Sequence, residues 1–153
     1  MREKLTAKLD ELDKHLAQLK KNLNYLEVFY TFPLKEKYIK IILESSDIDK
    51  LDSIAYRIIK FQDSLGRVIK LFFSIAEENT DMLTMIDLIN LAEKVGFDID
   101  VKLWRELREL RNNLTYEYAE NYEKIAYALN RLKELLPRFE KILDELKVRS
   151  SGL

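Results

Sequence analysis

The sequence contains no cysteine and only one histidine in 153 residues. Without cysteine there are no disulfides, no thiolate zinc sites and no thiol nucleophile. A single histidine also leaves no paired-histidine metal motif, and the chain has neither a glycine-rich phosphate loop nor a nucleophile elbow. We therefore predict that the protein holds no metal, has no cofactor and lacks most familiar enzyme motifs.

Glycine and proline are scarce, at 3 and 2 residues. So few turn formers exclude a turn-rich sandwich or barrel. Alanine, glutamate, lysine, leucine and arginine make up about half of the chain, which is typical of long helices. The length suits one domain with a single core.

Neither sign of charge dominates, because 26 basic residues face 27 acidic ones. Binding to nucleic acid would therefore need a local basic patch. No apolar run approaches the roughly 18 residues of a membrane-spanning helix, and residues 1–21 are charged throughout, unlike a signal sequence. We predict a cytoplasmic protein that does not bind membranes.

Apolar residues recur every three or four positions, as in helices that bury one face. In the first segment this pattern consists of leucines at 5, 9, 12, 16, 19, 23 and 26. It recurs over 54–75, 103–114 and 122–146, and shorter helices are expected at about 34–44 and 82–96. We predict an all-α fold: an antiparallel bundle of four long helices with one or two short extra helices. Residues 1–149 would form one domain, and 150–153 would be a frayed tail.

An acidic cluster precedes the second long helix. Ser46 and Asp49 have the spacing of a capping box, and Asp47 and Asp52 add negative charge near the positive helix end. These carboxylates could also form a hard-cation site, but helix capping is our interpretation.

Two basic stripes follow the helical repeat. One consists of Arg57, Lys60, Arg67 and Lys70, which fall within about 140° on an ideal helix. In the other, arginines recur at 105, 108 and 111 between glutamates. The stripes are either solvated faces with intrahelical ion pairs or the walls of a phosphate-binding groove. Candidate phosphate and RNA ligands are Arg57, Arg105 and Arg108.

The segment L-R-N-N-L-T-Y-E-Y, residues 110–118, brings a guanidinium, two carboxamides and two phenols together. Arginine can clamp a phosphate with two hydrogen bonds and keeps its charge throughout a reaction. On an ideal helix Tyr118 lies about 20° from Arg111 but about 10.5 Å along the axis, whereas Tyr116 is turned by about 140°. Cooperation between Arg111 and Tyr116 would therefore require an early helix end or a second subunit.

The stretch R-E-L-R-N-N-L-T-Y-E-Y, residues 108–118, resembles the motif of the HEPN superfamily, especially its HepT-like toxins. R-I-I-K-F-Q-D-S-L-G at 57–66, I-D-L-I-N-L-A-E-K-V-G at 86–96 and Trp104 are similar to flanking parts of that family. The resemblance covers roughly residues 50–146. It implies an all-helical homodimer with a cleft lined by both copies of the motif, and pairing with a minimal nucleotidyltransferase antitoxin.

The family motif is an arginine, a polar neighbour and a histidine four to six residues after the arginine. Active members are metal-independent endoribonucleases in which histidine handles the 2′-hydroxyl proton and arginine steadies the phosphate. HepT-like members add a tyrosine that the antitoxin can modify with AMP. By this resemblance Arg111, Asn112 and Tyr118 match the motif, but Tyr116 stands where histidine is expected. A phenol is a much poorer base than imidazole near neutral pH.

Three hypotheses follow. The first is a HEPN toxin-like endoribonuclease of a toxin–antitoxin module, with a site at a dimer cleft that the loss of histidine weakens. The second is a non-catalytic homodimeric binding module that docks a nucleotidyltransferase and is adenylylated on Tyr118. The third is a helical bundle in which Tyr116, Tyr118, Tyr122 and Tyr127 only pack. The expected catalytic residues are Arg111, Asn112 and Tyr116, and the expected partners are a second copy, the nucleotidyltransferase and RNA.

Overall fold

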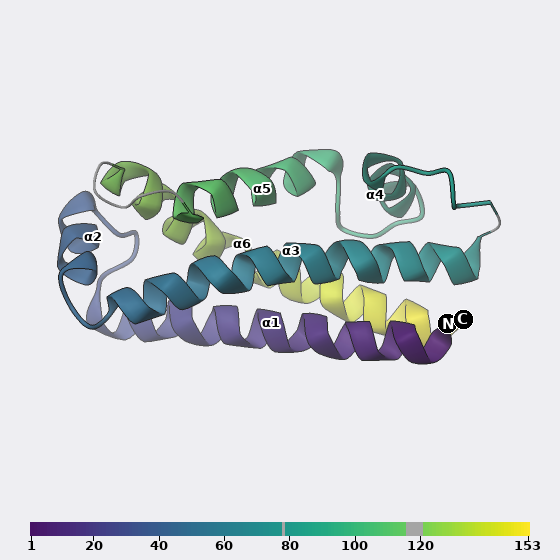
Figure 1. The fold of residues 1–153 in the computed structure, drawn as a ribbon, viewed down its shortest axis with the longest axis horizontal. Helices are drawn as coiled ribbons and strands as arrows, with labels where there is room; N and C mark the ends of the chain where they lie inside the picture. Colours follow the sequence, from purple (N-terminus) through teal and green to yellow (C-terminus); the bar gives the residue numbers. More distant parts are fainter. Residues whose placement is uncertain (78, 116–120) are drawn as a thin grey trace.

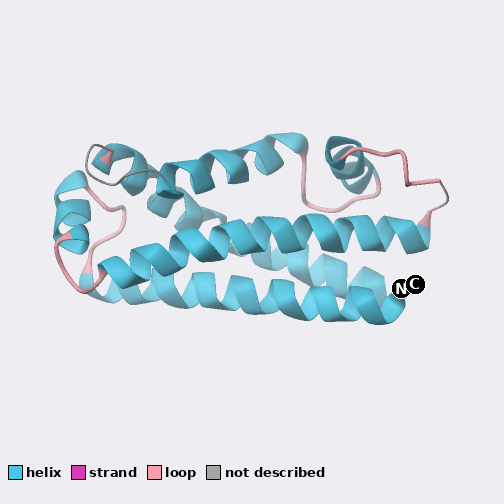
Figure 2. Cartoon of the chain, in the orientation of Figure 1, coloured by secondary structure: helices cyan, strands magenta, loops and turns pink. Residues whose placement is uncertain are grey.

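The computed structural model describes residues 1–77, 79–115 and 121–153. In these ranges the chain forms six helices and no strand (Figure 2). The helices are α1 (Arg2–Phe29), α2 (Glu36–Leu43), α3 (Ile48–Ala76), α4 (Met85–Lys94), α5 (Val101–Thr115) and α6 (Tyr122–Ser151). The predicted all-α class is confirmed.

The long helices form a bundle in which α1 packs most extensively against α3 (Figure 1). Helix α6 contacts α1 and α5, and α5 in turn contacts α3. The short helix α4 lies against α3 and α5, and α2 lies against α6 and α3. Helix α5 therefore bridges α3 and α6, and α4 lies beside both α3 and α5.

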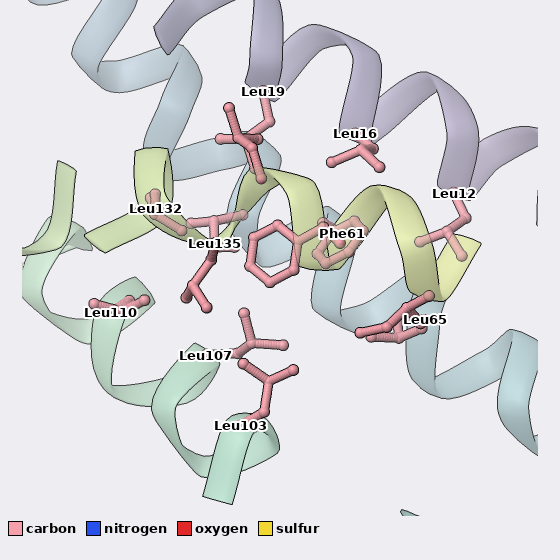
Figure 3. Close-up of a cluster of buried hydrophobic side chains, with 14 of the residues drawn as sticks. Leu12, Leu16, Leu19, Phe61, Leu65, Leu103, Leu107, Leu110, Leu132 and Leu135 are labelled. Atoms are coloured by element: carbon pink, nitrogen blue, oxygen red, sulfur yellow. The ribbon is translucent and has the colours of Figure 1, made fainter. Parts of the chain in front are cut away.

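The core is built from the apolar faces that the helical repeat predicts. All seven leucines of the α1 repeat are buried, as are the four leucines of α5 from Leu103 to Leu114. Figure 3 shows side chains from α1, α3, α5 and α6 converging on one cluster. In the core the rings of Phe61 and Phe139 lie 4.8 Å apart between centroids. Within the described residues, no helix is both long enough and apolar enough to cross a membrane.

The short helices and the chain end differ slightly from prediction. Helix α4 begins after Thr84, whose side chain forms a capping box with Asp87. It ends before Gly96, whose φ of 101° is the left-handed conformation that favours glycine. Helix α6 continues to Ser151, so helical structure extends into the segment expected to fray.

The predicted capping box at the start of α3 is wrong. The N-cap is Asp47, and its side chain makes no capping hydrogen bond. Its carboxylate instead accepts hydrogen bonds from the hydroxyls of Tyr25, at 2.9 Å, and Tyr30, at 2.5 Å. The hydroxyls of Tyr25 in α1 and of Tyr30 just after it thus bind the carboxylate that would otherwise cap α3.

Candidate phosphate-binding pocket

A concave pocket of about 540 Å³ lies where α3, α4 and α5 meet. Most of its lining comes from α3 and α5, and one residue comes from α4. The lining residues are Gln62, Asp63, Gly66, Arg67, Lys70, Met85, Trp104, Arg108, Arg111 and Asn112.

The helical repeat explains why these side chains share one hollow. On α5, Trp104, Arg108 and Arg111 are spaced by four and three residues, so they lie on one side of the helix. On α3, Gln62, Gly66 and Lys70 are spaced by four residues each and therefore also share one side of their helix. Because the leucines of α5 pack into the core, these flanking faces form the walls of the pocket.

Arg111 is held in place but remains accessible. Its Nη1 atom donates a hydrogen bond to Oε1 of Gln62 at 3.1 Å and lies 3.7 Å from Oδ1 of Asp63. The Arg111 side chain is 28% exposed and the Asp63 side chain 48% exposed. A partly exposed guanidinium with one neutral and one anionic neighbour can still receive an anionic ligand.

Gln62 orients this arginine. It is only 4% exposed, and its Nε2 atom donates to the backbone carbonyl of Trp104 at 3.1 Å. The two bonds together satisfy both ends of the buried carboxamide and connect α3 to α5. The sequence analysis did not predict this role of Gln62. A polar glutamine next to Phe61, on the otherwise apolar face of α3, could have indicated a buried hydrogen-bonding residue.

The pocket is strongly basic. Arg67, Lys70 and Arg108 are exposed on its rim, and no ion pair within the described residues involves any of them. With Arg111 they place four cations around one carboxylate, that of Asp63. Such an excess suits a phosphate or phosphodiester.

Two apolar side chains, those of Trp104 and Met85, also line the pocket. A Cβ built at Gly66 would lie 3.2 Å from Cη2 of Trp104 and 3.4 Å from Sδ of Met85. The missing side chain at this position therefore lets the indole and the thioether approach the α3 backbone closely. Trp104 and Met85 are both partly buried against the core.

The predicted site residues divide into two groups. Arg108, Arg111 and Asn112 line the pocket together, whereas Arg105 and Arg57 do not. Arg57 Nη1 instead lies 3.0 Å from Nδ1 of His15 on α1. Its guanidinium carbon also sits 5.1 Å from the ring centroid of its neighbour Tyr56.

Two predicted residues, Tyr116 and Tyr118, lie outside the described residues. Of the other two tyrosines in the packing hypothesis, Tyr122 packs partly buried against the core. Tyr127 is 52% exposed, so burial does not account for it.

In the described ranges, no group of three or more histidine, aspartate or glutamate side chains is arranged to hold a metal ion. Comparison of the chain with protein-family models, curated proteins and solved structures finds no match.

Proposed function

We propose that this protein is an RNA-directed, HEPN toxin-like component of a toxin–antitoxin module, and that the pocket between α3 and α5 binds the RNA phosphodiester. The observation that carries the proposal is the Arg111 guanidinium, held by buried Gln62 and open to a basic pocket. The motif Arg111–Asn112, with Tyr118 beyond it, supports the HEPN assignment by resemblance. Packing of α5 between α3 and α6 is compatible with a HEPN-like bundle of four long helices.

The chemistry of the pocket matches a phosphodiester. Arg111 can donate two parallel N–H bonds to phosphate oxygens, and the Asn112 carboxamide beside it can add a neutral hydrogen bond. Arg108, Arg67 and Lys70 would neutralise the adjacent phosphates. This sequence-independent attraction suits a protein that recognises the RNA backbone.

RNA cleavage by the family's scheme requires a base for the 2′-hydroxyl proton. Tyr116 stands at the motif position of that base, and the sole histidine, His15, is engaged with Arg57 and does not line the pocket. We therefore propose that the endoribonuclease activity is weakened or lost, while phosphate binding is kept.

The proposal includes a homodimer with α5 and the motif at its interface, in the cytoplasm. One chain already places four cations around the pocket, so charge alone does not require a second copy. The dimer would instead bring motif residues of the two copies together. A monomer in solution scattering at micromolar concentration would contradict it.

Incubation of RNA with purified protein and a chelator tests the catalytic part. We expect little or no cleavage by the wild type and a gain of cleavage in Tyr116→His that is lost in Tyr116→His/Arg111→Ala. Fast, chelator-resistant cleavage by the wild type that Arg111→Ala abolishes would show instead that Tyr116 supports turnover. Cleavage that persists in every Arg111 variant would contradict the assigned role of Arg111.

The missing histidine favours a second candidate, a non-catalytic homodimeric module that docks a minimal nucleotidyltransferase. In this case the phenol of Tyr118 would accept AMP. The test is incubation with ATP and a nucleotidyltransferase encoded by an adjacent gene, followed by mass spectrometry. A mass increase of one or more AMP units that Tyr118→Phe removes supports this candidate, and the absence of a complex counts against it.

A further inference from the structure

We propose that the pocket also contains a base-binding subsite, in which one unpaired RNA base lies against Trp104 and Met85 while Arg111 and Arg108 hold the neighbouring phosphates. This inference rests on the proposed RNA binding and specifies its substrate class: single-stranded RNA or an unpaired loop. A pocket for phosphate alone needs no aromatic wall, whereas a nucleotide has both an anionic and an aromatic part.

The residue types that line the pocket support the inference. Four cations and one carboxylate share the pocket with an indole and a thioether. Single-strand binding proteins combine the same two elements, a basic groove for the backbone and an aromatic ring for the bases. The polarizable sulfur of Met85 also makes favourable contacts with aromatic rings.

The order of residues along α5 matches the order of base and phosphates along a nucleic-acid strand. Trp104 and Arg108 are one helical turn apart, about 6 Å along the axis, and Arg111 lies about 4.5 Å beyond Arg108. A strand that runs along this face can therefore put a base on the indole and consecutive phosphates on the two guanidiniums. Arg67 and Lys70 of α3 line the same pocket.

Gly66 gives the subsite its shape. Replacing alanine by glycine inside a helix lowers the equilibrium constant for helix formation by up to about a factor of five. A glycine in the middle of α3 is therefore unfavourable for the helix itself, and a contact at this position must explain it. A Cβ here would lie 3.2 Å from Cη2 of Trp104, so its absence lets the indole lie close to the helix backbone.

The pocket favours RNA over an acidic protein surface. Planar aromatic bases can stack on an indole, whereas aspartate and glutamate side chains offer only the anionic part. The guanidinium of Arg111 already has a carboxylate neighbour in Asp63.

Two oligomers of equal charge test the inference. One is single-stranded 2′-O-methyl oligoadenylate of about 12 nucleotides, within the range of known single-strand sites. The other is its abasic analogue with the same number of phosphates. Both resist cleavage, because no 2′-hydroxyl is present to attack. We expect the wild type to bind the base-containing oligomer roughly 5- to 150-fold more tightly, the range for one stacked base.

Variants then separate the two parts of the site. Trp104→Leu should abolish the preference for bases, measured as the ratio of the two affinities, and Trp104→Phe should keep most of this ratio. Arg111→Gln should weaken the binding of both oligomers. If Trp104→Leu leaves the preference intact while Arg111→Gln weakens both, the base subsite is wrong and the proposed function stands. If Arg111→Gln changes neither, the proposed function itself fails.

Trp104 is the only tryptophan, so its fluorescence reports on this pocket directly in the wild type. Oligoadenylate should quench or shift the emission at concentrations where the abasic analogue does not. Identical responses to both oligomers would overturn the subsite. So would binding of a polyglutamate of matched charge as tight as that of oligoadenylate, which would assign the pocket to an acidic protein partner.

Discussion

The carboxamide of Gln62 lies between Arg111 and the backbone of Trp104. Its Oε1 atom accepts a hydrogen bond from Arg111 Nη1, and its Nε2 atom donates to the Trp104 carbonyl, both at 3.1 Å. Because amide oxygen and nitrogen have opposite roles, only one orientation of the carboxamide satisfies both partners. A single buried residue of α3 thus connects the phosphate-facing and the aromatic parts of the pocket.

Gln62→Leu should therefore act on both stability and binding. It removes both hydrogen bonds of Gln62, which at about 0.5–1.5 kcal/mol each costs about 1–3 kcal/mol in the free energy of unfolding. It also releases Arg111, and RNA affinity should fall by about 2- to 10-fold, the net value of one hydrogen bond. Urea unfolding and RNA titration measure the two effects.

A variant with a similar loss of stability but no contact with the pocket is the control. Leu19→Ala removes a fully buried side chain of α1 and should cost about 2–5 kcal/mol. If Leu19→Ala lowers RNA affinity as much as Gln62→Leu, the positioning role of Gln62 is wrong.

Asp63→Asn should raise affinity for RNA. The Asp63 carboxylate lies 3.7 Å from Arg111 Nη1 at a partly exposed site, so it competes with phosphate and repels it. The pair is exposed enough that we expect only about a 2- to 5-fold gain. Glu109→Gln, an exposed neutralisation on α5 outside the pocket, has the same charge change and should have a smaller effect. Equal gains would point to overall charge rather than to Asp63.

Stability should depend on pH through His15. Burial, and then the adjacent Arg57 guanidinium, lower the pKa of His15 below its ordinary 6.5, with Lys60 acting in the same direction and Glu11 opposing. Since the unfolded chain then binds the proton more readily, the free energy of unfolding should fall as pH drops through 6.5 toward the lowered folded pKa. His15→Gln should flatten this dependence between about pH 7.5 and 5.5. An unchanged pH profile in that variant would exclude His15 as its source.

Gly66→Ala tests the close approach of Trp104 to α3. Alanine should favour the helix by about 0.8–1 kcal/mol, but its Cβ meets Trp104 Cη2 at 3.2 Å, so the indole must shift. We expect near-wild-type stability, a changed tryptophan emission spectrum and weaker binding of oligoadenylate. An unchanged spectrum together with unchanged affinity would show that Gly66 does not shape the pocket.

Much of the fold could be predicted because each long helix buries one continuous apolar stripe. The leucines of α1 and of α5 follow the helical repeat and are all buried. The capping prediction at Ser46 and Asp49 was wrong because local spacing cannot show that Tyr25 of α1, and Tyr30 just after α1, hydrogen-bond to Asp47.

The candidate site could be predicted only in part. Arg108, Arg111 and Asn112 are neighbours on one helix, so the motif alone grouped them. The pairing of Arg111 with Gln62 depends on tertiary packing between α5 and α3, which no local pattern reveals. The same holds for Arg57, which belongs to a basic stripe in sequence but contacts His15 in the structure.

The central claim is that Arg111 binds RNA phosphate, and the most direct test is equilibrium binding of a non-cleavable RNA to Arg111→Gln over a range of salt concentrations. Arg105→Gln is the matched control, because Arg105 has the same charge on the same helix but lies outside the pocket. We expect Arg111→Gln to weaken binding by about 10-fold or more and to reduce the salt slope by about 1, with little change in Arg105→Gln. Equal losses in both variants, or none in Arg111→Gln, would contradict the claim.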